Sequence, residues 1–90
     1  MSYRPKDTQE RILHRLKIAR GHLNKVISMV EEDAYCIDVM QQSQAVEKAL
    51  QETTSLILEN HLNTCVVEHI KKGESKTSIE EIMKVFRKHR

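Results

Sequence analysis

Residues 34–72 read AYCIDVMQQSQAVEKALQETTSLILENHLNTCVVEHIKK and contain neither proline nor glycine. Asp33 precedes this stretch as its predicted N-cap, and Gly73 follows it as a helix terminator. We therefore expect one helix over residues 34–72, about 58 Å long at roughly 1.5 Å per residue. No single neighbour in a small monomeric bundle covers a helix of that length, so a symmetric second copy is the economical explanation.

The flanking sequence predicts two further helices, over residues 8–32 and 78–89. Asp7 is the predicted N-cap of the first, and the third follows Thr77. In the first helix, the apolar side chains fall within an arc of roughly 100° and form one face. These are Ile12, Leu16, Ala19, Leu23, Val26, Ile27 and Val30. With no strand pattern or internal repeat visible, the sequence predicts an all-α fold with residues 1–90 as a single domain.

The composition favours packed helices and disfavours several classes of function. The 90 residues include one Phe, two Tyr and no Trp, so the apolar content is mainly aliphatic. A chain this short builds a small core, which makes oligomerisation a way to bury more surface. No apolar run is long enough to cross a bilayer and no signal segment is visible, so we expect a cytoplasmic protein without membrane contacts. No nucleophile–base pair or phosphate-binding loop indicates an enzyme or a small-molecule substrate.

Charge is distributed unevenly along the chain. Residues 1–32 hold seven Lys and Arg against four Asp and Glu, whereas residues 33–72 hold three against six. On the first helix Arg11, Arg15, His22 and Lys25 lie within about 80° of one another, beside the apolar face. This stripe predicts phosphate contacts that read DNA shape more than base edges, although a solvated basic face is the plainer interpretation. The predicted DNA-binding residues are Arg11, Arg15, Lys17, Arg20 and Lys25.

A histidine and a cysteine four residues apart, His61 and Cys65, share a face of the long helix. By itself the pair equally suits a buried thiol beside a surface imidazole. Cys36 falls within about 40° of both on the helical wheel, but it lies roughly 43 Å from Cys65 along the axis. Antiparallel pairing of two copies would bring Cys36 of one protomer to His61 and Cys65 of the other, which gives two equal sites per dimer.

Two thiolates and one imidazole form a soft set of three ligands. Such a set suits Cu(I), and Zn(II) becomes possible if a fourth ligand joins. Cys36 falls in the first turn of its helix, where the helix dipole favours the thiolate. His69 lies one turn beyond Cys65, and we interpret it as a surface histidine and not as a fourth ligand.

RLKIARGHLNKVISMVEEDAYCIDVMQQSQAV at residues 15–46, followed by NHLNTC at residues 60–65, resembles the CsoR/RcnR/FrmR family of metal-sensitive transcriptional repressors. The likeness extends from about Arg11 to Glu81 and is greatest to the copper-sensing members. It implies a three-helix protomer that pairs into an antiparallel four-helix-bundle dimer and then a disc-like tetramer. It also implies a repressor that binds operator DNA in the apo form and leaves it when Cu(I) binds, which derepresses copper-export genes.

The resemblance also implies roles for individual residues. Cys36, His61 and Cys65 match the Cu(I) ligands of the family. Tyr35 and Glu81 match positions that link the ligand histidine to the rest of the protomer, although by themselves they are an interfacial aromatic and a solvated acid. Nickel and cobalt sensors of the family carry His where this chain has Cys65, formaldehyde sensors lack that cysteine, and persulfide sensors lack the histidine. Copper therefore fits this chain best.

One position departs from the family pattern, and two other functions remain open. Related proteins often carry a basic residue where this chain has Glu52, with Lys48 about one turn away as a substitute. Arg15 is the residue that the resemblance makes most important for DNA binding.

The first alternative function is a persulfide or redox sensor in which oxidised sulfur joins Cys36 to Cys65 of the partner. The second is a helical oligomerisation module whose thiols are incidental.

Overall fold

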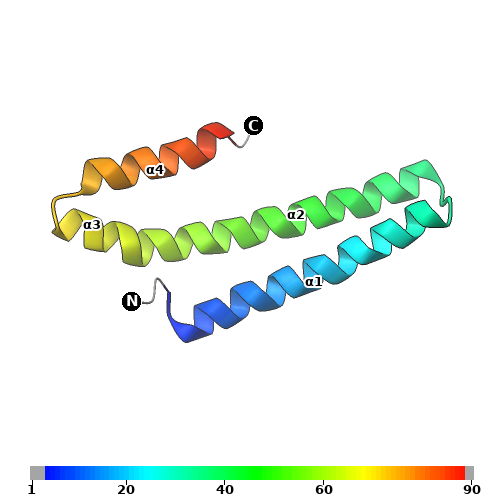
Figure 1. Cartoon of the computed structure of the whole chain (residues 1–90), viewed down its shortest axis with the longest axis horizontal. Coiled ribbons are helices and arrows are strands. Elements are labelled where there is room, and N and C mark those ends of the chain that lie inside the picture. Colours follow the sequence, from blue (N-terminus) through cyan, green and yellow to red (C-terminus); the bar gives the residue numbers. More distant parts are fainter. Residues whose placement is uncertain (1–3, 89–90) are drawn as a thin grey trace.

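The structure is a computed structural model that describes residues 4–88. Its elements are α1 (Lys6–Glu31), α2 (Cys36–His61), η1 (Leu62–Val66), α3 (Val67–Lys71) and α4 (Ser75–Lys88). The chain remains right-handed helical through His61, Val66 and Val67, so α2, η1 and α3 form one long rod. Figure 1 shows α1 antiparallel beside this rod and α4 folded back along its C-terminal part. The predicted all-α protomer of three helical segments is therefore confirmed over the described residues.

The helix starts differ from their predicted positions. The first helix begins at Lys6, with Pro5 in the N-cap position, and Asp7 lies inside the first turn. Pro5 has a φ of −59° and its carbonyl accepts a 3.0 Å hydrogen bond from the Gln9 amide, so the preset φ of proline begins the helix. Tyr35, not Asp33, is the N-cap of α2. The third helix begins at Ser75, three residues early, and its predicted end at residue 89 lies outside the described residues.

Both connections between helices use the same hydrogen-bonding pattern. After α1, the amides of Asp33 and Ala34 donate to the carbonyls of Val30 (3.1 Å) and Met29 (2.9 Å), respectively. After α3, the amides of Gly73 and Glu74 donate in the same way to Ile70 and His69. This is the Schellman motif, which places one residue in the left-handed region. That residue is Asp33 in the first turn (φ 57°) and Gly73 in the second (φ 78°).

The core of the protomer is a narrow stripe between α1 and α2. Ile12, Ala19 and Val26 are buried on α1 at the seven-residue spacing of one helical stripe, and they face Val46 and Thr53 of α2. The Thr53 hydroxyl donates a 2.9 Å hydrogen bond to the Ala49 carbonyl, which satisfies this buried polar group within its own helix. Packing therefore holds the central part of the α1–α2 hairpin together.

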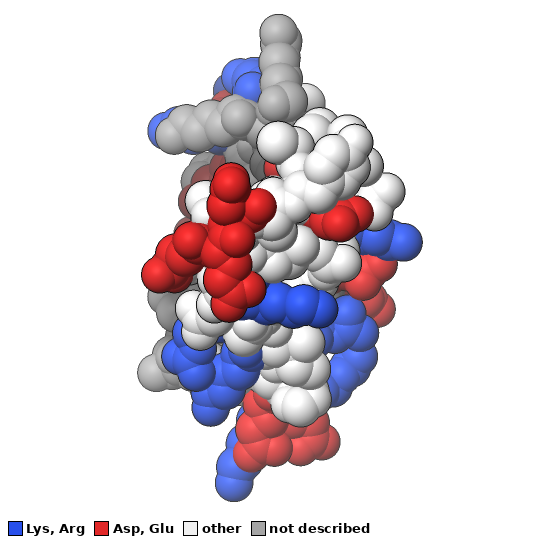
Figure 2. All heavy atoms as spheres, turned by 90° about the vertical axis from the view of Figure 1, so that its right-hand side faces the viewer, with Lys and Arg blue, Asp and Glu red and all other residues white. Residues whose placement is uncertain are grey.

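Most large apolar side chains of the protomer lie outside this stripe. Four hydrophobic residues are buried in the part of the chain that the structure describes, whereas eighteen large ones are exposed. Leu16, Leu23, Ile27 and Val30 all belong to the apolar face predicted for α1 and remain exposed. Figure 2, viewed onto the α1–α2 turn, shows an uncharged area running between groups of acidic and basic side chains. Of the helices that the structure describes, none has both the length and the apolar character needed to cross a membrane.

The two left-handed turn positions generate a paired stability prediction. Asp33→Gly should raise the free energy of unfolding by about 0.5–1 kcal/mol, because glycine adopts a positive φ without the steric penalty of a Cβ. Gly73→Ala should lower it by about 1–2 kcal/mol for the converse reason. Urea unfolding at one fixed protein concentration measures both changes.

Gly21 provides the matched control for these substitutions. It lies within α1, and a Cβ added there meets no atom within 4 Å. Gly21→Ala should therefore raise stability by about 0.5–1 kcal/mol through helix propensity alone. A loss of stability in Gly21→Ala would mean that another copy of the chain packs closely against this position.

Candidate metal centre and nucleic-acid surface

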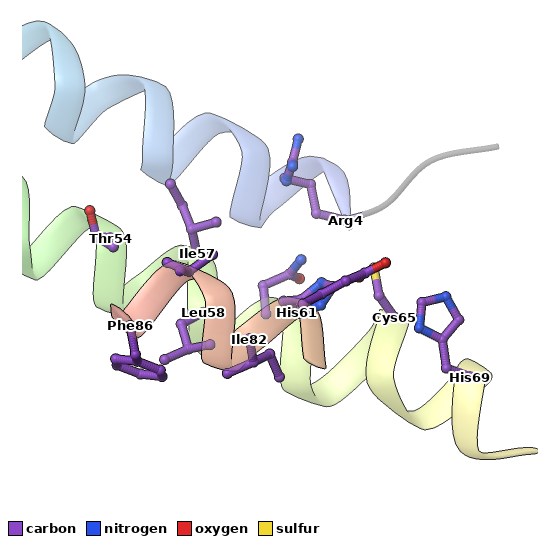
Figure 3. A pocket seen from close by; sticks show the side chains of 12 residues that line it. Arg4, Thr54, Ile57, Leu58, His61, Cys65, His69, Ile82 and Phe86 are labelled. Atoms are coloured by element: carbon purple, nitrogen blue, oxygen red, sulfur yellow. The ribbon is translucent and has the colours of Figure 1, made fainter. Parts of the chain in front are cut away.

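A pocket of about 680 Å³ lies between the C-terminal part of the long rod and α4. The rod contributes His61, Cys65 and His69 to its wall, and α4 contributes Glu81. The apolar part of the wall is formed by Ile57, Leu58, Ile82, Val85 and Phe86. In Figure 3 the side chains of His61 and Cys65 lie next to one another, with Ile82 and Phe86 presented from α4. The pocket thus combines a nitrogen donor and a sulfur donor with a mostly apolar surround.

The helix between these two donors is locally irregular. Residues Leu62–Val66 form a π-helical turn, in which hydrogen bonds span five residues instead of four. Within it, the Thr64 hydroxyl donates a 2.8 Å hydrogen bond to the Asn60 carbonyl and lies 3.6 Å from the Cys65 sulfur. His61 and Cys65 are both half-buried, which shields the donors in part while leaving them accessible. The periodicity of the sequence did not indicate this irregular turn.

Cys36 lies at the opposite end of the rod from the pocket. It is the first residue of α2, is exposed, and is a thiol like Cys65. Twenty-five residues of helix separate it from His61, which corresponds to about 38 Å at roughly 1.5 Å per residue. Among residues 4–88, no three side chains of His, Cys, Asp or Glu are arranged so as to hold a metal ion. One protomer therefore brings His61 and Cys65 together but keeps Cys36 apart from them.

Tyr35 and Glu81 are likewise at opposite ends of the protomer. Tyr35 precedes Cys36 at the N-cap of α2 and is 69% exposed, the highest exposure among the large apolar and aromatic side chains that the structure describes. Glu81 is an exposed residue of α4 that lines the pocket with His61 and Cys65. The structure therefore places Glu81 beside the two donors and Tyr35 beside the third.

His69 is not the surface histidine that we expected. It is half-buried, lines the pocket, and its Nδ1 forms a hydrogen bond with the hydroxyl of Ser78, which is fully buried. The bond joins α3 to α4 across the turn at Gly73. His69 lies four residues before Gly73, and Ser78 lies five residues after it. A sharp reversal of the chain at this glycine brings the two residues together, and the glycine is therefore the sequence signal that could have indicated their contact.

The five predicted DNA-binding residues are all exposed on α1, but they do not share one surface. Arg11, Arg15 and Lys25 follow the side of α1 that carries His22, whose Nε2 is 2.8 Å from Gln42 Oε1 of α2. Arg20 instead lines a groove on the other side of the hairpin. Its neighbours there are Leu16, Ala19, Leu23, Val46 and Leu50. Arg11 and Arg20 are nine residues apart, which is about 180° around a helix.

Comparison with known proteins identifies relatives over almost the whole chain. Residues 8–88 match the family model described as metal-sensitive transcriptional repressor. The chain is 42% identical over 83 residues to the copper-sensing transcriptional repressor CsoR of Mycobacterium ulcerans, covering 92% of this chain and 71% of that protein. It is 44% identical over 71 residues to CsoR of Mycobacterium tuberculosis H37Rv, covering 79% of this chain and 60% of the relative, which is less than two thirds.

A solved structure has the same fold. The crystal structure of the copper-sensing repressor CsoR with Cu(I) from Geobacillus thermodenitrificans NG80-2 superposes with a TM-score of 0.91 at 37% sequence identity. The similarity covers 99% of this chain and 93% of that one. The family match and these relatives together show that this chain belongs to the family of metal-sensitive transcriptional repressors.

Proposed function

We propose that this protein is a Cu(I)-responsive repressor that binds operator DNA in the apo form and is released when Cu(I) binds. The observation that carries this proposal is the separation of three soft donors, with His61 and Cys65 in one pocket and Cys36 at the far end of the same helix. Several relatives are named copper-sensing repressors, and a structural relative contains Cu(I). The genes that we expect to be derepressed are those for copper efflux.

The metal site in this proposal is shared between two protomers. Antiparallel pairing of two long rods would bring Cys36 of one protomer to His61 and Cys65 of the other. The exposed apolar side chains along α1 and α2 support such pairing, because a second copy would remove them from water. In this arrangement the homodimer has two equivalent sites, and the disc-like tetramer is a pair of such dimers.

The donor set fits Cu(I) chemically. Two thiolates and one imidazole are soft ligands, and two of these donors line a pocket whose wall is partly apolar. Glu81 lines the pocket and would orient the His61 ring through its other nitrogen, together with Tyr35 of the partner. Zn(II) would require a fourth ligand or water to complete its usual coordination.

Release from DNA follows from coupling between the metal sites and the DNA-binding surface. An ion that bridges protomers favours one relative position of the two α1–α2 hairpins, and DNA that prefers another position is bound less tightly. Arg11, Arg15 and Lys25 lie along one side of α1 and would contact phosphates there. Lys17 and Arg20 would contribute from the rest of the α1 surface, whereas Glu52 of α2 is exposed and offers no attraction to phosphate.

The shared site can be tested by Cu(I) titration of mixed dimers. Wild-type protein should bind one Cu(I) per protomer in competition with a Cu(I) chelator, whereas Cys36→Ala and Cys65→Ala alone should each lose this tight binding. A mixed dimer with one subunit of each variant, purified through two different tags, should regain one tight site per dimer. Thiolate-to-copper absorption in the ultraviolet measures the stoichiometry.

The outcomes of this experiment discriminate among the candidate functions. Recovery of one site in the mixed dimer supports sharing, because one interface then contains an intact Cys36, His61 and Cys65. No recovery would refute a site that is shared between two protomers in this way. Failure of the wild type to outcompete the chelator, with persulfide joining the two cysteines across the dimer, would replace the copper proposal with sulfur sensing.

The role of Arg15 can be tested with duplex DNA selected from a random library by the apo protein. Arg15→Ala should weaken binding at least tenfold and make the affinity less dependent on salt, by about one counterion for each phosphate that Arg15 neutralises. Arg87→Ala is the matched control, because it removes the same charge from an exposed position on α4. Equal losses of affinity in both variants would refute a specific role for Arg15, and no DNA binding at low salt would favour a plain oligomerisation module.

A further inference from the structure

The turn between the two pocket donors is the one departure from α-helical geometry in the rod of residues 36–71. It begins directly after His61 and includes Cys65. In a regular α-helix, residues four apart differ by about 40° around the axis. A π-helical turn contains more residues per rotation, so the chain rotates less between His61 and Cys65. The irregularity therefore changes the direction of the Cys65 side chain relative to His61, and it also rotates the following residues of α3 relative to α2.

Thr64 occupies the centre of this turn and contacts both the backbone and the sulfur. Its hydroxyl donates to the Asn60 carbonyl at 2.8 Å, and the same oxygen lies 3.6 Å from Cys65 Sγ. Thr53 forms the same kind of bond to the Ala49 carbonyl at 2.9 Å, yet the helix around it remains regular. A threonine hydroxyl bonded four residues back is therefore compatible with an α-helix. What distinguishes Thr64 is its location within the π-helical turn and its contact with the sulfur.

A threonine hydroxyl has a single hydrogen to donate. The Asn60 carbonyl at 2.8 Å is the better-placed acceptor of this hydrogen, and the Cys65 sulfur at 3.6 Å is a second acceptor within reach. A negatively charged thiolate is a stronger acceptor than a neutral carbonyl, because hydrogen bonds to ionised groups are roughly twice as strong. When Cys65 is a metal-bound thiolate, the sulfur competes for the hydrogen, and a small rotation of the Thr64 side chain suffices to deliver it.

We propose that Thr64 is a positioning residue for Cys65, which aims the sulfur into the His61 pocket and donates a hydrogen bond to it when it coordinates a metal ion. This inference rests on the proposed metal site at His61 and Cys65. Transfer of the hydrogen bond from carbonyl to sulfur also alters the bonding of Asn60, which lines the same pocket. Thr64 thus connects the coordinated sulfur with the backbone of the turn.

The test compares Cu(I) binding of Thr64→Val with that of the wild type in the full-length protein. Valine preserves the β-branched shape and removes the hydroxyl, so Cu(I) affinity should fall about tenfold, as is usual when a group that supports a metal ligand is lost. The thiolate-to-copper absorption should shift to longer wavelength, because the sulfur electrons are no longer stabilised by a hydrogen bond. Thr64→Ser retains the hydroxyl and should restore both the affinity and the absorption.

Thr53→Val is the matched control, because it deletes the same hydrogen bond in a regular part of the same helix. Its Cu(I) affinity and absorption should equal those of the wild type, whatever its thermal stability. Wild-type values in Thr64→Val, or equal changes in both valine variants, would overturn the role of Thr64. If Thr64→Val lacks wild-type helicity by circular dichroism, Thr64→Ala takes its place with the same expected losses.

A failure of the inference is distinguishable from a failure of the proposed function. Wild-type protein that does not bind Cu(I) tightly refutes the function itself. In that case, a crystal structure of metal-free Thr64→Val decides the structural part of the inference. We expect the Cys65 sulfur to turn away from the His61 pocket in this variant, and an unchanged position of the sulfur would refute the positioning role.

Discussion

The structure depends on one constraint. The rod of α2, η1 and α3 is too long for α1 and α4 of the same chain to cover. α1 buries one stripe of α2, and α4 turns back over the C-terminal part alone. Full burial of a large aliphatic side chain contributes about 1.5–3 kcal/mol, and a small domain is stable by only about 5–15 kcal/mol. Eighteen large apolar side chains are exposed in the described residues, so burying even a few of them against another copy would add a substantial fraction of that net stability. The exposed apolar side chains lie along α1, along the rod and on α4.

The three helical segments could be predicted from the sequence because apolar periodicity and glycine placement both favour them. Residues 34–72 lack any residue that interrupts a helix, and Gly73 adopts the left-handed conformation that ends it. Helix starts were less predictable, since several polar residues compete for the N-cap position. Asp33 illustrates this competition. It has the chemistry of an N-cap, but its backbone is used to end α1, with a φ of 57°.

The donors of the candidate site could be identified from spacing, because an i, i+4 pair on a helix must share a face. The π-helical turn between His61 and Cys65 could not be identified in this way. It depends on a choice between hydrogen bonds spanning four and five residues, which differ little in energy and leave no apolar pattern. The contact of His69 with Ser78 depends on how α4 folds back, which is a tertiary feature. The helical wheel placed Arg11, Arg15 and Lys25 together, and the structure adds that Arg20 faces an apolar groove instead.

Cys36 lies at one end of the rod, and Cys65 lies near the other end. This separation links copper binding to the number of subunits that a cell contains. An isolated chain presents two of the proposed donors in one place and a single thiol in another, so it would bind copper less tightly than a dimer that brings the three together. Under the shared-site proposal, tight binding appears only above the concentration at which chains associate, and bound copper in turn favours association by mass action. The copper level at which such a sensor responds would then depend on its own abundance, and a cell could adjust that threshold by changing how much of the protein it makes.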